Sequence, residues 1–246
     1  MSIFYGLYDF YDLSDSSDFS DSSDFFDFID FLGFSDFSEF SAFSDFSTFS
    51  VFFTFSCSAY SKDYEYQQFL SDNALIPLIE SKSDNTVDII EFSSFSCSHC
   101  ATFHNETLLE LKESDVFKNV NYYVVDFPLN QAAFYASIVG SCDLSLRPNY
   151  IDSVYENYDV WTKAETGEGI IELLNSYGLQ HGLGEEQVET CLKNEDLQNK
   201  LLSLQVDSQN IFGVESTPTF IVGGKKVQGN RPASEFIKII SKKLNQ

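Results

Sequence analysis

The chain has 246 residues, with 38 Asp or Glu against 14 Lys or Arg, and a formal net charge of −24 at pH 7. A chain this acidic repels phosphate backbones, so nucleic-acid binding is not expected. The length suits one compact domain of about 190 residues preceded by a tail.

Residues 1–59 form a low-complexity tract of Asp, Phe and Ser that advances in steps of three, as in residues 36–47 (DFSEFSAFSDFS). This period fits neither a helix nor a strand, so we expect no packed structure there. The uncharged residues 46–56 suit a cleaved or membrane-retained export signal, whereas the acidic residues before them do not. Another alternative concerns the gene. A three-residue repeat implies a repeated DNA segment, which can slip or be assigned the wrong start codon or reading frame, so the mature chain would begin near Tyr60.

Two strands and a helix are predicted next. Residues 86–92 (TVDIIEF) and 120–127 (VNYYVVDF) are short and rich in β-branched and aromatic residues, as buried strands are. Between them, residues 97–112 have apolar side chains at helical spacing, after serines at 93, 94 and 96 that are N-cap candidates. A helical crossover makes the two strands parallel.

Helical patterns then fill residues 130–209. Residues 219–222 and 225–228 predict a hairpin across two glycines, and residues 233–244 predict a last amphipathic helix. This order predicts an α/β, thioredoxin-like fold with an inserted helical domain. Its parts are the thioredoxin-like residues 60–129, the insertion 130–209 and the returning residues 210–246.

The five cysteines are Cys57, Cys97, Cys100, Cys142 and Cys191. Cys97 and Cys100 form a C-x-x-C motif at the start of the predicted helix, which indicates a redox pair. The alternative is a zinc site of Cys97, Cys100 and His104. Zinc sites usually draw a second ligand pair at similar spacing, which does not follow here, so no metal and no cofactor are expected.

Disulfide exchange needs a thiolate, and a free cysteine with a pKa near 8.5 is only roughly 3 percent ionised at pH 7. At a helix start, unpaired N–H groups and the positive end of the dipole favour the anion of Cys97. His99 adds a donor, or a positive charge when protonated. We therefore predict that Cys97 is the attacking sulfur and that Cys100, further into the helix, is the resolving thiol.

Residues 91–100 (EFSSFSCSHC), 126–133 (DFPLNQAA) and 214–220 (VESTPTF) resemble the DsbA-like family of bacterial thiol–disulfide oxidoreductases, over about residues 87–240. A lone C-x-x-C motif is weak evidence, but one followed about 120 residues later by Thr-Pro-Thr-Phe at a hairpin is specific. Family members commonly have Pro-His between the cysteines, where this chain has Ser98 and His99. That departure leaves its oxidising strength open.

The resemblance implies three further site residues. Pro218 is expected to be cis and beside the cysteine pair, which leaves the backbone of Thr217 free to bind an extended substrate; a trans proline at a strand start is the alternative. An acid at the position of Glu91 implies a proton acceptor or donor for Cys100. The alternative there is an acid near a strand end that water solvates.

The other cysteines and histidines leave alternatives open. Some relatives carry cysteines near Cys142 and Cys191; if paired, these would be a structural disulfide and indicate an oxidising compartment, and two separate thiols are the alternative. Cys57 is a lipidated first residue or an unpaired thiol. His104 and His181 are expected to be ordinary helix residues. Trp161 and the tyrosines of residues 150–158 are expected in the core and surface of the insertion.

The resemblance implies a monomeric enzyme that introduces disulfides into exported proteins. Its substrates would be cysteine-containing proteins and its partner a DsbB-type membrane oxidase. The compartment would be the periplasm or another exported location, with a membrane tether at the N-terminus as one form. An isomerase or reductase on the same fold, or a non-catalytic binding or chaperone module, is the alternative.

Overall fold

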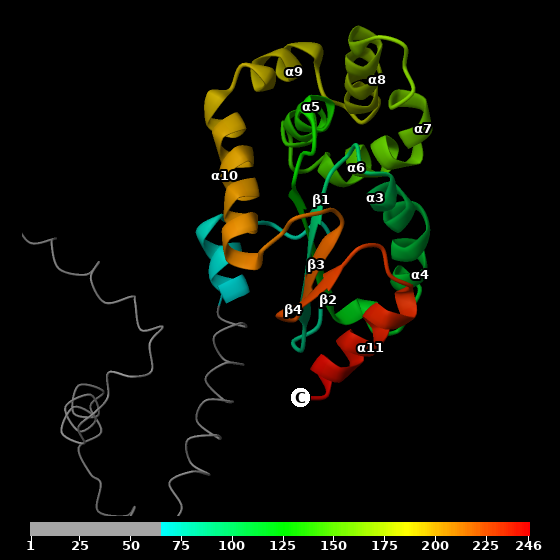
Figure 1. Ribbon diagram of the computed structural model, residues 1–246, viewed down its shortest axis with the longest axis vertical. Helices are drawn as coiled ribbons and strands as arrows, with labels where there is room; N and C mark the ends of the chain where they lie inside the picture. The colour runs from blue at the N-terminus through cyan, green and yellow to red at the C-terminus, as the bar shows by residue number, and fades with distance from the viewer. Residues whose placement is uncertain (1–64) are drawn as a thin grey trace, which may run out of the picture. The chain divides into compact units, whose positions relative to one another are not determined.

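The computed structural model describes residues 65–246, which begin with a helix over residues 65–72 (Figure 1). The predictions for the low-complexity tract, Tyr60 and Cys57 lie outside these residues.

Four strands form one sheet in the order β2-β1-β3-β4. They are β1 (Val87–Ser93), β2 (Val120–Asp126), β3 (Thr219–Val222) and β4 (Lys225–Gln228). β1 runs parallel to β2 and antiparallel to β3, and β3 pairs antiparallel with β4. The predicted parallel crossover and hairpin are confirmed. Gly223 and Gly224 make the hairpin turn with φ of 49° and 79°, which glycine adopts at no steric cost.

The crossover helix is continuous but changes its winding in the middle. It consists of α3 (Ser98–Thr102), the π-helical turn η1 (Phe103–Thr107) and α4 (Leu108–Lys112), and the short 3-10 helix η2 (Phe117–Asn119) leads into β2. The prediction that a serine caps the start of this helix is wrong. The N-cap is Cys97 itself, whose sulfur accepts a hydrogen bond from the backbone N–H of Cys100 at 3.4 Å.

A run of helices separates β2 from β3 in the sequence, where the insertion is predicted. They are α5 (Gln131–Gly140), α6 (Arg147–Glu156), α7 (Tyr158–Trp161), α8 (Gly167–Gln180), α9 (Glu185–Leu192) and α10 (Glu195–Phe212), and α11 (Ala233–Leu244) ends the fold. In Figure 1, α5 to α9 gather beyond the end of the sheet where α3 begins, and α10 runs back beside the sheet. The domain boundaries at 129/130 and 209/210 stay a prediction. Across residues 65–246, no helix has both the length and the apolar character needed to cross a membrane.

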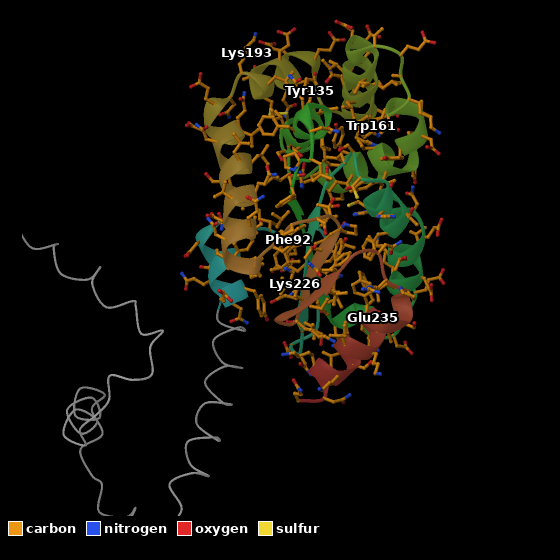
Figure 2. The ribbon with its side chains drawn as sticks, in the orientation of Figure 1. Phe92, Tyr135, Trp161, Lys193, Lys226 and Glu235 are labelled. Atoms are coloured by element: carbon orange, nitrogen blue, oxygen red, sulfur yellow. A yellow bond between two sulfur atoms is a disulfide. The ribbon has the colours of Figure 1, made fainter. Side chains whose placement is uncertain are left out.

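Apolar clusters cover both faces of the sheet, because side chains alternate along β1. Val87 and Ile89 pack with the crossover helix and α11, whereas Ile90 and Phe92 pack with α10 and the helix over residues 65–72 (Figure 2). A third cluster, which contains Trp161, fills the inserted helices and extends to both cysteines of the C-x-x-C motif. The residues that follow β1 therefore lie where the sheet and the inserted helices meet.

Candidate active site

Cys97 and Cys100 lie where the chain turns from β1 into α3. The backbone N–H of Cys97 donates to the carbonyl oxygen of Ser94 at 3.0 Å, which fixes the turn. Cys97 is 9% exposed and Cys100 is fully buried, while Ser98 and His99 between them are exposed. Cys97 is therefore the more accessible of the two cysteines.

The surroundings of Cys97 lower its pKa to about 6. The hydrogen bond from the Cys100 thiol contributes most, and Thr217 and the backbone N–H groups of His99 and Cys100 add to it, whereas burial opposes it. At pH 7 the thiolate is then the main form. The lowered pKa fits the prediction for this sulfur, but its largest cause is the second thiol rather than the helix start. A role for the imidazole of His99 stays a prediction.

The pKa of Cys100 moves the other way. Burial raises it most, and the hydrogen bond to Cys97 and the charge of Glu91 raise it further. Cys100 is therefore a protonated thiol that donates to its neighbour. It needs a base before it can attack, and an acid when it leaves.

The loop before β3 lies against the cysteine pair. The peptide bond between Thr217 and Pro218 is cis, as the resemblance implies. The sulfur of Cys97 lies 3.3 Å from the carbonyl oxygen of Thr217, to which the thiol form donates. The backbone N–H of Gly229 donates to the carbonyl oxygen of Pro218 at 2.8 Å and ties the loop to the end of β4. Residues about 120 positions apart thus meet at one sulfur atom.

Glu91 is fully buried, so the alternative of a solvated acid is wrong. Its Oε1 accepts a hydrogen bond from the Ser93 hydroxyl at 2.6 Å. Its Oε2 accepts from the Tyr122 hydroxyl and lies 3.0 Å from Nε2 of His104. Since an isolated buried carboxylate is costly, these partners explain how Glu91 is tolerated under the cysteine pair.

His104 is not an ordinary helix residue, and that prediction is wrong. It is 5% exposed, contacts Glu91, and stacks on the ring of Tyr155 with centroids 4.3 Å apart. It follows Cys100 by four residues, so both lie on the helix face toward the sheet. This spacing could have indicated the contact, although His104 lies in the π-helical turn, where the backbone departs from α-helical spacing.

The part of the chain that forms the sheet, the inserted helices and this site matches a known protein family. Residues 81–242 match the sequence model of a family described as Thioredoxin. The chain belongs to this thioredoxin family. A Rickettsia felis protein, provisionally named a protein-disulfide oxidoreductase, is 24% identical over 180 residues, which is 72% of this chain and 62% of that protein. A Rickettsia typhi protein with the same provisional name is 26% identical over 166 residues, 65% of this chain and 58% of that protein. The chain thus spans less than two thirds of the length of either relative.

Solved structures show the thioredoxin fold directly. α-DsbA1 of Wolbachia pipientis superposes with a TM-score of 0.60 at 19% identity, covering 67% of this chain and 89% of that one. BdbD of Bacillus subtilis, in its oxidised form, has a TM-score of 0.58 at 17% identity, covering 69% and 94%. The predicted thioredoxin-like fold and the resemblance to the DsbA-like family are confirmed.

Two tyrosines of the inserted helices reach this thioredoxin-family site. The Tyr155 hydroxyl lies 2.8 Å from the Ser93 hydroxyl, and the Tyr158 hydroxyl donates to the carbonyl oxygen of Ser96 at 3.1 Å. The sequence predicts only core or surface positions for the tyrosines of residues 150–158. Each contact joins residues 62 positions apart, and no local pattern carries that information.

The second cysteine pair lies within the insertion. Cys142 and Cys191 form a disulfide with a Cα–Cα distance of 5.7 Å, so the paired alternative is the one observed. Cys142 follows the end of α5 and Cys191 lies in α9, so the bond ties these helices together. His181, expected to be an ordinary helix residue, has its Nε2 2.7 Å from the hydroxyl of Ser153.

Proposed function

We propose that the protein is a thiol–disulfide oxidoreductase of the DsbA type, which introduces disulfides into exported proteins through Cys97 and Cys100. The observation that carries this proposal is the acidic thiol of Cys97 beside the cis bond of Thr217 and Pro218. The names of the Rickettsia relatives and the fold shared with DsbA proteins support the same class.

The reaction begins with the two cysteines joined by a disulfide. A substrate thiolate attacks the sulfur of Cys97, and the bond between Cys97 and Cys100 breaks, so that Cys100 leaves with the electron pair and takes up a proton. A second substrate thiolate then attacks the substrate sulfur of the mixed disulfide and expels Cys97 as a thiolate. The substrate loses two electrons and the cysteine pair gains them.

The low pKa of Cys97 favours this direction of electron flow. Stabilising the thiolate stabilises the reduced protein, so the protein gains free energy when it gives its disulfide away. The reduced pair must then be reoxidised by a disulfide-bearing partner, for which a DsbB-type membrane oxidase is the candidate.

The remaining residues serve the two sulfurs. Thr217 and Pro218 would bind an extended substrate peptide through their backbone, next to the sulfur that the substrate attacks. Glu91 would exchange protons with Cys100, whose pKa is raised. His99, exposed between the cysteines, would meet the substrate.

An oxidising compartment fits the second cysteine pair. Disulfides such as that of Cys142 and Cys191 persist in exported proteins and are rare in a reducing cytosol. We therefore propose that the protein acts after export, in the periplasm or an equivalent compartment, as a monomer.

The test is to measure the reduction potential and the dithiol-oxidising activity of the full chain. Oxidised glutathione serves as the terminal oxidant and a reduced unfolded protein as the substrate. We expect a potential well above the roughly −270 mV of thioredoxin, and activity that Cys97→Ser removes. A potential as reducing as that of thioredoxin would replace the oxidase with a reductase. Activity that survives Cys97→Ser would leave the binding-module alternative.

A further inference from the structure

The C-terminal part of the fold carries a charge opposite to that of the part before it. Residues 65–207 contain 24 acids and 7 Lys or Arg, whereas residues 208–246 contain 2 acids and 6 Lys or Arg. The formal net charge is therefore −17 for the first part and +4 for the second. The separation also exists in space, because α8 and α9 lie at the top of Figure 1 and α11 lies at the bottom.

The cations of the second part gather on one surface. β4, Arg231 and Glu235 surround a shallow hollow. On α11, two lysines follow Glu235 at helical spacing, so they continue this surface beside β4. Figure 2 shows Lys226 and Glu235 at the end of the domain opposite to Lys193. We call this surface the basic face and define it by its exposed cations, which are Lys225, Lys226, Arg231, Lys238 and Lys242.

The positive charge of the basic face is not neutralised by neighbouring acids. Of the ion pairs formed between residues 65 and 246, none includes a cation of this face. Lys226 donates to the carbonyl oxygens of Phe212 and Gly213, and Nε of Arg231 donates to that of Gln228 at 3.0 Å. These acceptors are uncharged. Glu235 is the one acid among the residues that line the hollow.

The basic face lacks the apolar anchors on which protein interfaces depend. Among the described residues, every exposed large apolar side chain lies at Ile211 or before it. The apolar side of α11, with Phe236, Ile239 and Ile240, is buried against the sheet. Protein interfaces centre on buried aromatic and apolar side chains, whereas lipid phosphates attract cations without such an anchor. The composition of this face therefore favours a charged membrane surface over a protein.

Local explanations account for some of these cations but not for all of them. Lysines on an edge strand hinder pairing with another sheet, which applies to Lys225 and Lys226 on β4. A cation in the last turn of a helix is favoured by the helix dipole, which applies to Lys242. Neither effect explains Arg231 and Lys238, or the scarcity of acids in residues 208–246.

We propose that the basic face binds the protein to membrane surfaces that expose anionic phospholipid headgroups. The acids at the other end of the domain do not prevent this contact. α10 joins the two ends and its 18 residues span about 27 Å, whereas charges are screened beyond about 8 Å at physiological ionic strength. One end of the basic face adjoins the active-site loop, because Gly229 donates to the carbonyl oxygen of Pro218 and Arg231 follows two residues later. The bound protein would therefore hold this loop near the headgroups.

The test is sedimentation of the full-length protein with two kinds of vesicle. One kind contains phosphatidylcholine alone, and the other contains equal amounts of phosphatidylcholine and phosphatidylglycerol, which is anionic. We expect binding to the mixed vesicles at low salt and little binding to the neutral ones. Raising the NaCl concentration to about 1 M, where the screening length falls to about 3 Å, should weaken binding at least about tenfold.

Variants of α11 show whether the basic face makes this contact. Each Lys or Arg near an anionic surface strengthens binding about fivefold, so Lys238→Gln with Lys242→Gln should weaken it about twentyfold. Glu235→Gln removes a repelled acid and should strengthen it about fivefold. Lys163→Gln with Lys193→Gln is the matched control, because it removes the same charge from exposed lysines of the insertion. That control should bind within about twofold of the wild type.

Three outcomes overturn the proposal. They are equal binding to both kinds of vesicle, equal losses in the variant of α11 and in its control, and no binding to the mixed vesicles at low salt. In the last case, retention on immobilised polyglutamate that the α11 variant loses would assign the basic face to an acidic protein instead. A disturbed fold cannot produce the gain expected from Glu235→Gln. Binding requires no redox step, so the proposed function fails separately, when dithiol oxidation survives Cys97→Ser.

Discussion

The two cysteine pairs of this molecule are chemically alike, but they lie in very different surroundings. Cys97 receives hydrogen bonds that favour its thiolate, and Cys100 lies over Glu91 and its partners. In the insertion, the sulfurs of Cys142 and Cys191 lie 3.3 Å and 4.0 Å from one backbone carbonyl oxygen, that of Ile138. Cys142 and Cys191 are bonded to each other, so neither sulfur is present as the thiolate that makes the first pair reactive.

The pairs also differ in what their bond does for the fold. Cys97 and Cys100 are three residues apart on one helix turn, so joining them closes almost no loop. Cys142 and Cys191 are separated by 49 positions, and their bond restricts a long stretch of the unfolded chain. Under the proposed function, the first pair would serve electron transfer and the second would serve stability.

The variant with the largest expected effect on this comparison replaces Cys97. Cys97→Ser should lower dithiol oxidation at least about a thousandfold, because the covalent intermediate cannot form. The double variant Cys142→Ser with Cys191→Ser is the matched control and should keep its activity. The comparison would be wrong if both variants lost activity to the same extent in the same assay.

A variant of Glu91 tests whether the surroundings of Cys100 affect the rate at which its sulfur attacks. Glu91→Gln keeps the size of the side chain but removes the proton acceptor, and should slow attack by Cys100 about ten- to a hundredfold. Quenched mixed-disulfide kinetics measure this step. Glu110→Gln, an exposed acid on the same crossover helix, is the control. Equal rates in the wild type and Glu91→Gln would assign the buried carboxyl to structure alone.

The pH dependence of Cys97 alkylation sharpens the contrast in reactivity. Its midpoint should lie near pH 6, and Cys100→Ala should move it upward, since the Cys100 thiol is the largest cause of the lowered pKa. Iodoacetamide labelling followed by mass spectrometry gives both midpoints. An unchanged midpoint in Cys100→Ala would leave the helix start as the dominant influence.

The same pKa affects the stability of the reduced protein. The ordinary pKa of about 9 falls to about 6 in the folded state, so the thiolate stabilises the fold fully above pH 9 and partly between these values. This contribution declines as the pH falls from 9 and is lost below 6. Urea unfolding of the reduced wild type and of Cys97→Ser across this range measures it. The difference between them should shrink toward acid pH.

The smallest effect on exchange is expected from the second pair. Replacing Cys142 and Cys191 by serine should lower the free energy of unfolding by about 4 kcal/mol in the chain-entropy treatment and change the exchange rate less than about twofold. Chemical denaturation and the dithiol-oxidation assay measure the two quantities. A large loss of exchange at unchanged stability would mean that this disulfide takes part in electron transfer.

The sequence predicts those parts of the fold that local patterns determine. The hairpin strands and α11 have the predicted limits, because alternation, glycine turns and helical spacing are all local signals. The motif and the resemblance identify Cys97, Cys100, Pro218 and Glu91, and the structure brings these four residues into one site.

The rest of the site depends on contacts that no short pattern encodes. Ser93 and Tyr155 meet across 62 positions, and His104 meets Glu91 across 13. The serine caps were a reasonable prediction from residue preference, but the sulfur of Cys97 takes the capping position. Partners of a buried acid become visible only when the strands and helices that carry them are packed.

The hydroxyls of Tyr155 and Tyr158 connect the inserted helices to the chemistry by single hydrogen bonds. One of these bonds reaches the last residue of β1, and the other reaches the residue just before Cys97. The inserted helices therefore support the backbone on which the cysteine pair is mounted, so a substitution in the insertion can change the position of the sulfurs without touching them.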